Sequence, residues 1–141
     1  MKTTRRVAAL ISGLIAACML TLVGATPASA ATWTLMHHPG HEQRVCLWPN
    51  TSWHGTYLHA PFQGVWTTDI DLSMRNLPPG SYSNGGLMQG PGSSVDGTSA
   101  VAAVHVEIVG APAGEYIAEI WADDGTETQS IPVIITFSEN C

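Results

Sequence analysis

The sequence predicts an all-β fold, an immunoglobulin-like β-sandwich of about seven strands that contains one disulfide. Short segments rich in Val, Ile, Thr and aromatic residues alternate with Gly, Pro, Asn and Ser, and no stretch keeps a helical period. The residues that follow an N-terminal leader number about 110, which suits one domain, 31–141.

A signal peptide is predicted over residues 1–30. A basic start precedes an almost wholly apolar or small run over 7–23, and Ala28 and Ala30 then lie at the small-residue positions that a signal peptidase requires. We therefore expect cleavage after Ala30, secretion, and no membrane span. The alternative is a lipoprotein anchored at Cys18, because the residues before this cysteine resemble a lipobox.

Removal of the leader would leave a strongly acidic chain. All eleven acidic residues lie beyond it, and Arg44 and Arg75 are the only basic residues there, so the formal charge changes from −6 to −9. Such a surface repels phosphate groups, which argues against nucleic-acid and anionic-membrane partners. We expect a soluble monomer.

Cleavage would also leave two cysteines, Cys46 and Cys141. An even pair in an exported chain predicts one internal disulfide, which would tie an early strand to the last residue. Two free thiols or an intermolecular bridge are the alternatives.

The C-terminal half contains the clearest strands, over 100–109, 115–122 and 127–137. An Asp-Gly step within 123–126 predicts a tight hairpin between the last two. Pro132 cannot donate a ladder hydrogen bond, which suggests an edge position or a bulge. The positions expected to face the core are Ala102, Val104, Val106 and Ile108 in the first strand and Ile131, Val133, Ile135 and Phe137 in the third.

The N-terminal half is less regular. In the segment Leu77–Ser99, 14 of 23 residues are Gly, Pro or Ser, so we expect a long loop that is either functional or flexible. The strands expected before this loop lie near 32–36, 44–48, 56–60 and 65–70.

A tyrosine corner supports the immunoglobulin-like prediction. Tyr116 follows the turn 110–114, and its hydroxyl should bond back to that turn. Ala118 lies where an antibody domain has a cysteine, so the expected disulfide differs from the one in antibodies.

Several short motifs together point to a family. They are Ala31–Leu35, Val45-Cys46, Gly64–Thr68, Asn76–Ser81, Gly114–Tyr116, Trp121–Thr126 and the terminal Cys141. With these motifs, the mature chain resembles a group of small secreted actinobacterial proteins of unknown function, over essentially its whole length. The resemblance implies one exported domain with one disulfide and implies no site residues.

Tryptophan is the most informative residue type for function. Either Trp48 or Trp66 should lie in the core, whereas Trp33, Trp53 and Trp121 are candidate exposed rings. Exposed aromatic rings on a sandwich can bind sugar rings or a protein partner. The alternative is that these rings cover the ends of the sandwich.

Other chemistry has weak support. His37, His38 and His41 are metal-ligand types, but their spacing is not the His-Glu-x-x-His arrangement of metalloproteases, so they are weak candidates. No nucleophile motif is present. We expect no enzyme activity and no cofactor.

The sequence thus predicts a non-catalytic extracellular binding domain, with an extracellular glycan, the cell wall or a protein as partner. Glycan binding through exposed aromatic rings is the first specific interpretation. The alternatives are a small secreted protease inhibitor that acts through Leu77–Ser99, and a metal-binding protein that uses the early histidines.

Overall fold

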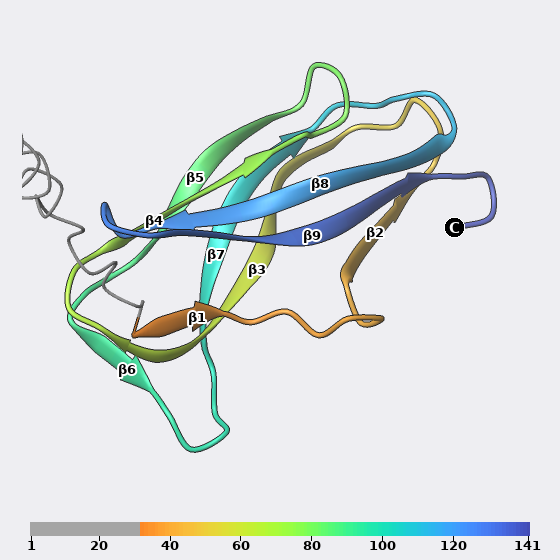
Figure 1. Ribbon diagram of the computed structural model, residues 1–141. Coiled ribbons are helices and arrows are strands. Elements are labelled where there is room, and N and C mark those ends of the chain that lie inside the picture. The colour runs from red at the N-terminus through yellow and green to blue at the C-terminus, as the bar shows by residue number, and fades with distance from the viewer. Residues whose placement is uncertain (1–31) are drawn as a thin grey trace, which may run out of the picture. The chain divides into compact units, whose positions relative to one another are not determined.

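The computed structural model describes residues 32–141, which contain nine strands and no helix (Figure 1). No helix in this part of the chain is therefore available to cross a membrane. The predicted signal peptide and the Cys18 anchor lie outside the described residues. The strands are β1 (Trp33–Leu35), β2 (Gln43–Leu47), β3 (Trp53–Trp66), β4 (Ile70–Arg75), β5 (Tyr82–Met88), β6 (Gly92–Ser94), β7 (Ala100–Ile108), β8 (Gly114–Asp123) and β9 (Thr128–Phe137).

The strands form two sheets that share β5. The first sheet has the order β1-β3-β7-β5, with β6 also paired to β3, and the second has the order β5-β4-β8-β9-β2. All pairs are antiparallel except β2–β9. β1, β3, β7 and β5 thus take the places of strands A, B, E and D of an immunoglobulin-like sandwich, and β4, β8 and β9 take those of C, F and G. The all-β sandwich is confirmed, whereas the strand count of about seven is too low.

The N-terminal half differs most from the prediction. One continuous strand, β3, covers the expected strand 56–60 and the start of the expected strand 65–70. It continues past Pro61 because β1 and β7 flank it on both sides. The segment 77–99, expected to be a loop, contains β5 and β6.

Glycines explain this difference, because they let β5 change sheets. Its first part pairs with β7 and its last part, from Gly86, pairs with β4. A Cβ on Gly86 would lie 2.2 Å from the carbonyl oxygen of Ala103, so only glycine allows the two backbones to approach this closely. The composition that suggested a loop therefore serves a strand that joins the two sheets.

The core lies between the inward faces of the two sheets. The inward positions expected in the strands 100–109 and 127–137 are all buried, as the period-two pattern predicts. β9 as a whole is not an edge strand, since it lies between β8 and β2, but its β2 side is unpaired at Pro132 itself. Proline is tolerated there because the β2 pairing begins only at Val133.

The predicted tyrosine corner is present. The hydroxyl of Tyr116 donates to the carbonyl oxygen of Pro112 at 3.3 Å, and its ring meets Phe137 edge-on with 5.7 Å between ring centroids. Ala118 is fully buried. The corner fixes the start of β8 against the turn before it.

Side chains bridge the margin of the sandwich that β5 does not close. From β2, the amide of Gln43 both accepts from the backbone N–H of His59 and donates to its carbonyl oxygen, each at 3.0 Å. From β9, the amide of Gln129 accepts from Leu35 N–H at 2.9 Å and donates to the carbonyl oxygen of Trp33 at 3.0 Å. Each glutamine thus satisfies backbone groups at an edge of the first sheet, where a further strand could otherwise pair.

Trp33 forms a third bridge across this margin. Its ring is 2% exposed and packs against Phe62, while its indole N–H donates to Oδ2 of Asp124 at 2.7 Å. The other oxygen of Asp124 accepts from Thr126 and Glu127 in the predicted β8–β9 hairpin turn. These hydrogen bonds, with Trp33 foremost, hold the pKa of Asp124 far below its usual range.

The predicted disulfide joins Cys46 in β2 to Cys141, 95 residues later, with 5.5 Å between the Cα atoms. It fastens the edge strand of the second sheet to the segment that follows β9. Next to it, Ser138 N–H donates to the carbonyl oxygen of Leu47 at 2.8 Å.

Replacing Asp124 should destabilise the domain. We expect Asp124→Ala to lower the free energy of unfolding by about 2–3 kcal/mol at pH 7, because it leaves a buried indole N–H without its charged acceptor. Urea unfolding followed by tryptophan fluorescence measures this.

The same experiment carries a pH test. Because folding lowers the pKa of Asp124, its ionisation stabilises the protein above the usual carboxyl pKa of about 4 and ceases to do so as the pH falls further. The difference between wild type and Asp124→Asn, which keeps an oxygen acceptor, should shrink below about pH 4. A difference that stays constant from pH 7 to pH 2 would contradict this assignment.

Removal of the disulfide should lower the free energy of unfolding by more than the Asp124→Ala substitution does. A closed loop of 95 residues corresponds to about 4–5 kcal/mol in the chain-entropy model. We expect a loss of this order when the wild type is reduced, measured by urea unfolding with and without dithiothreitol. The Cys46→Ser/Cys141→Ser double variant is the control, because its stability should not respond to the reductant. Equal stability of the oxidised and reduced protein would contradict the prediction.

Candidate functional site

The outward face of the first sheet is almost free of charge. Among Asp, Glu, Lys and Arg, Glu107 is the only residue of this type in its strands β1, β3, β5, β6 and β7. Around this carboxylate the face is aromatic and imidazole-rich. We call this cluster the tyrosine–histidine face and define it as His54, Tyr57, Tyr82, His105 and Glu107.

Tyr57 and His105 form a stacked pair on this face. They are directly paired on β3 and β7, their ring centroids are 4.7 Å apart, and their planes are inclined by 18°. Their neighbours Leu58 and Val104 are buried in the core, which fixes the outward direction of the pair. Tyr57 is nevertheless 58% exposed, so the ring offers a held, accessible surface.

Two hydrogen bonds hold the Glu107 carboxylate in place. Nδ1 of His54 donates to Oε2 and the backbone N–H of Gly55 donates to Oε1, both at 2.9 Å. Gly55 has a φ of +62°, which a residue with a side chain rarely adopts, and this conformation places its N–H at the carboxylate. The hydrogen bond from His54, together with that from Gly55, lowers the pKa of Glu107, so the group is ionised at neutral pH.

Tyr82 lies on the other side of β7. It pairs directly with Glu107 across β5 and β7, and it is 55% exposed. Ordinary strand spacing and rise place the Cα atoms of Tyr57 and Tyr82 about 12 Å apart. The carboxylate and the imidazole of His105 thus lie between two exposed phenol rings.

Irregular pairing marks the same part of the sheet. The register of β3 shifts between Trp53 and Thr56, and that of β5 shifts between Ser83 and Gly85. Both shifts flank the stretch of β7 that contains His105 and Glu107. Bulges of this kind redirect side chains and often lie next to functional sites.

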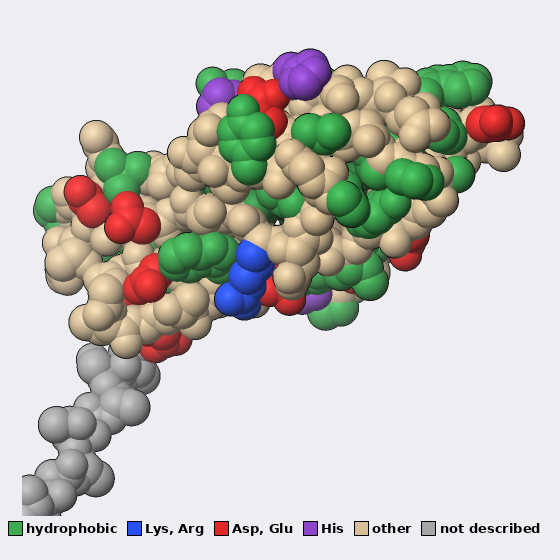
Figure 2. Space-filling view, turned by 90° about the horizontal axis from the view of Figure 1, so that it is seen from above, with side chains coloured by type: hydrophobic (Ala, Val, Ile, Leu, Met, Phe, Trp, Pro, Cys, Tyr) green, Lys and Arg blue, Asp and Glu red, His purple; other side chains and the backbone are tan. Residues whose placement is uncertain are grey.

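The described residues carry a large excess of acidic side chains. Both arginines are paired with glutamates of β8, Arg44 with Glu115 at 3.8 Å and Arg75 with Glu119 at 2.6 Å. Figure 2 shows one side of the molecule, on which acidic, histidine and hydrophobic side chains lie next to one another and Lys or Arg is visible at a single place. Residues 32–141 carry eleven acidic residues and these two arginines, so this part of the chain as a whole has a negative formal charge.

The tryptophans expected to be exposed divide into three cases. The prediction for Trp33 is wrong, because its ring is buried and hydrogen-bonded to Asp124. Trp53 is 42% exposed, but it pairs with the inward-facing Ile108 and thus lies at the end of the sandwich. Trp121 lies on the outward side of the second sheet, half-buried between Ser73 and Ser130.

The remaining two tryptophans resolve the open choice of a core ring. Trp66 is buried and its indole N–H donates to the carbonyl oxygen of Gln89 at 2.9 Å, whereas Trp48 is exposed. Two tryptophans, Trp33 and Trp66, therefore belong to the core.

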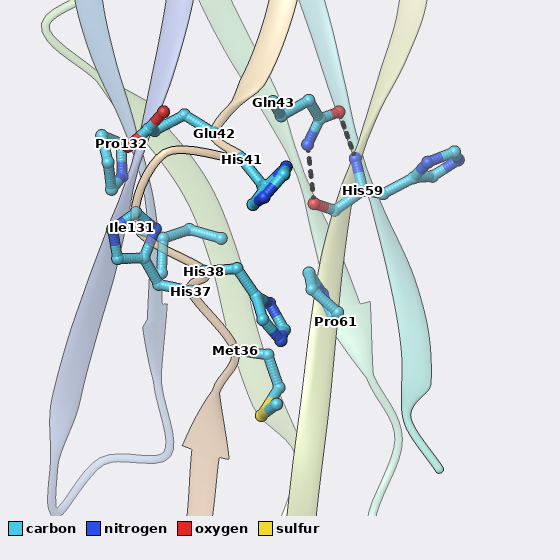
Figure 3. Close-up of a pocket in the computed structure, with 10 residues that line it drawn as sticks. All are labelled: Met36, His37, His38, His41, Glu42, Gln43, His59, Pro61, Ile131 and Pro132. Atoms are coloured by element: carbon cyan, nitrogen blue, oxygen red, sulfur yellow. Dashed lines mark hydrogen bonds between the residues drawn. The ribbon is translucent and has the colours of Figure 1, made fainter. Parts of the chain in front are cut away.

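The early histidines line a small cavity of about 110 Å³ (Figure 3). The structure adds His59 and Glu42 to the expected His37, His38 and His41. Figure 3 shows the imidazole rings spread around the cavity, with the ring of His59 pointing away from it. Within residues 32–141 no group of three or more His, Cys, Asp or Glu side chains is placed to hold a metal ion.

The segment 77–99 is not one long loop. Its strands β5 and β6 pair with strands of both sheets, which leaves short connections before, between and after them.

The tyrosine–histidine face was not predictable from single residues. His105 and Glu107 lie at alternate positions of a clear strand, which marks them as outward. The partners Tyr57 and Tyr82 lie 48 and 23 residues away from His105 along the chain, and only the register of β3 and β5 on β7 brings them together.

Comparisons with known proteins agree with an uncharacterised family. A comparison with curated proteins finds no match. Among solved structures, the ASH/PapD-like domain of human CEP192 (PapD-like domain 7) is distantly similar, with 11% identity, a TM-score of 0.36, and coverage of 77% of this chain and 86% of that one. Residues 34–139 match the family described as "Family of unknown function (DUF5980)", and the chain therefore belongs to this family.

Proposed function

We propose that this chain is an exported, non-catalytic domain that binds polysaccharide through the tyrosine–histidine face. The observation that carries the proposal is the held, exposed ring of Tyr57 with Tyr82 across β7. The apolar faces of sugar rings stack on exposed aromatic rings, and their hydroxyls need hydrogen-bonding groups beside those rings. His105 and Glu107 supply such groups between the two tyrosines.

The chemistry of the face supports sugar binding over a typical protein interface. Protein interfaces have a core of large apolar side chains with a polar rim. Here the centre is a carboxylate with an imidazole, and the aromatic rings stand on either side of it. The site lies on paired strands rather than on loops, which keeps the rings in place before a ligand arrives.

Export is part of the proposal and rests on the leader and the disulfide. A Cys46–Cys141 bridge suits an oxidising compartment. An extracellular polysaccharide is the kind of partner that a protein in that compartment meets.

Replacement of the exposed tyrosines should weaken binding to polysaccharide. We expect Tyr57→Ala and Tyr82→Ala each to reduce retention on insoluble chitin, cellulose or cell-wall sacculi by about threefold to tenfold, the size of one aromatic stacking contact. Tyr57→Phe keeps the ring and should retain most of the binding. Depletion of the protein from solution by each polysaccharide gives the binding curves.

The matched control is Ile117→Ala, which removes an exposed apolar side chain from the second sheet. It should bind as the wild type does. Trp121→Ala tests the rival face: loss of binding in this variant together with full binding by Tyr57→Ala would place the site on the second sheet. No retention of the wild type on any of the polysaccharides would overturn the proposed function.

A further inference from the structure

Glu107 is more than a hydrogen-bonding partner for sugar hydroxyls. It is the one formally charged side chain in the strands of the first sheet, and it stands between two exposed aromatic rings. A carboxylate on an otherwise uncharged face concentrates negative potential at one point.

The carboxylate has acceptor capacity left for a ligand. Its two oxygens together offer about four lone-pair sites, and the hydrogen bonds from His54 and Gly55 occupy one on each oxygen. The Glu107 side chain is 16% exposed, so part of it is accessible to solvent. An ammonium group is the donor that gains most here, because a charge-assisted hydrogen bond is stronger than a neutral one.

The two tyrosine rings also favour a positively charged ligand. The face of a phenol ring attracts a cation within about 6 Å of its centre. The two arginines of the described residues do not compete for Glu107, since both are engaged with glutamates of β8 in the second sheet. The described residues also carry a negative formal charge overall, which repels uronic-acid and sulfated polysaccharides.

Resting on the proposed function, we infer that the bound polysaccharide is an amino-sugar polymer with free primary amines, and that an ammonium group of this polymer binds at Glu107 between Tyr57 and Tyr82. The sugar ring that carries the amine stacks on one tyrosine, and its ammonium group donates to the free acceptor positions of the carboxylate. No covalent step is involved.

A comparison of chitosan, chitin and cellulose tests this inference, because the three polymers share the same linkage geometry and differ at one substituent. We expect the wild type to bind chitosan more tightly than the two neutral polymers. Raising the salt concentration from about 0.1 M to about 1 M shortens the Debye length from about 10 Å to about 3 Å, so it should weaken the binding of chitosan and leave that of chitin nearly unchanged.

Glu107→Gln isolates the charge. This variant should reduce the preference for chitosan over chitin by about fivefold, the size expected of a partly exposed charge pair, because the glutamine amide still bonds to sugar hydroxyls but carries no charge. Asp71→Asn is the control, because it removes one negative charge from an exposed position in β4 of the second sheet. Far-ultraviolet circular dichroism and thermal unfolding establish that both variants are folded.

The outcomes separate the two proposals. Equal affinity for chitosan and chitin, or an equal effect of Glu107→Gln and Asp71→Asn, would overturn the amine inference and leave polysaccharide binding intact. Binding to polylysine as tight as that to chitosan, without any binding to neutral polymers, would overturn the inference in favour of a basic peptide partner. Absence of binding to every polysaccharide would overturn both.

Discussion

The margin of the sandwich that no shared strand closes is the point on which the rest of the structure depends. At the other margin, β5 pairs with both sheets, so backbone hydrogen bonds hold them together. At this margin three side chains act instead, those of Gln43, Gln129 and Asp124. Because each of them bonds to β1 or β3, they keep the first sheet in register with the second and protect its edge from pairing with another chain.

This closure also explains how the proposed site is supported. β3 and β5 are each fastened to the second sheet, β3 by Gln43 and β5 by direct pairing with β4. β7 lies between them, so its outward side chains have fixed neighbours on both sides. The register shifts next to His105 and Glu107 are possible because the core beneath them, from Val104 to Val106, remains regular and buried.

The sequence predicts a residue's place in the structure wherever that place depends only on its own strand or turn. The alternation from Ala102 to Ile108, the corner at Tyr116 and the Asp-Gly turn are of this kind, and the Cys46–Cys141 pair needed only counting. The wrong predictions concern residues whose environment is formed by partners far away along the chain. The burial of Trp33 depends on its partner Asp124, which lies 91 residues away along the chain. The glycines of 77–99 indicate a loop by composition, although Gly86 serves a close approach of two backbones. The pairing of Tyr57 with His105 follows from register, which no single strand encodes.

Inward and outward side chains alternate along β3 and β7, so residues with two different roles lie next to each other in the same strand. Inward positions such as Leu58 and Val106 are buried, and changes there alter the packing. Outward positions such as Tyr57 and Glu107 are not part of this core. Under the proposed function, the outward positions of β3, β5 and β7 are therefore where a change of ligand would leave the packing of the sandwich intact.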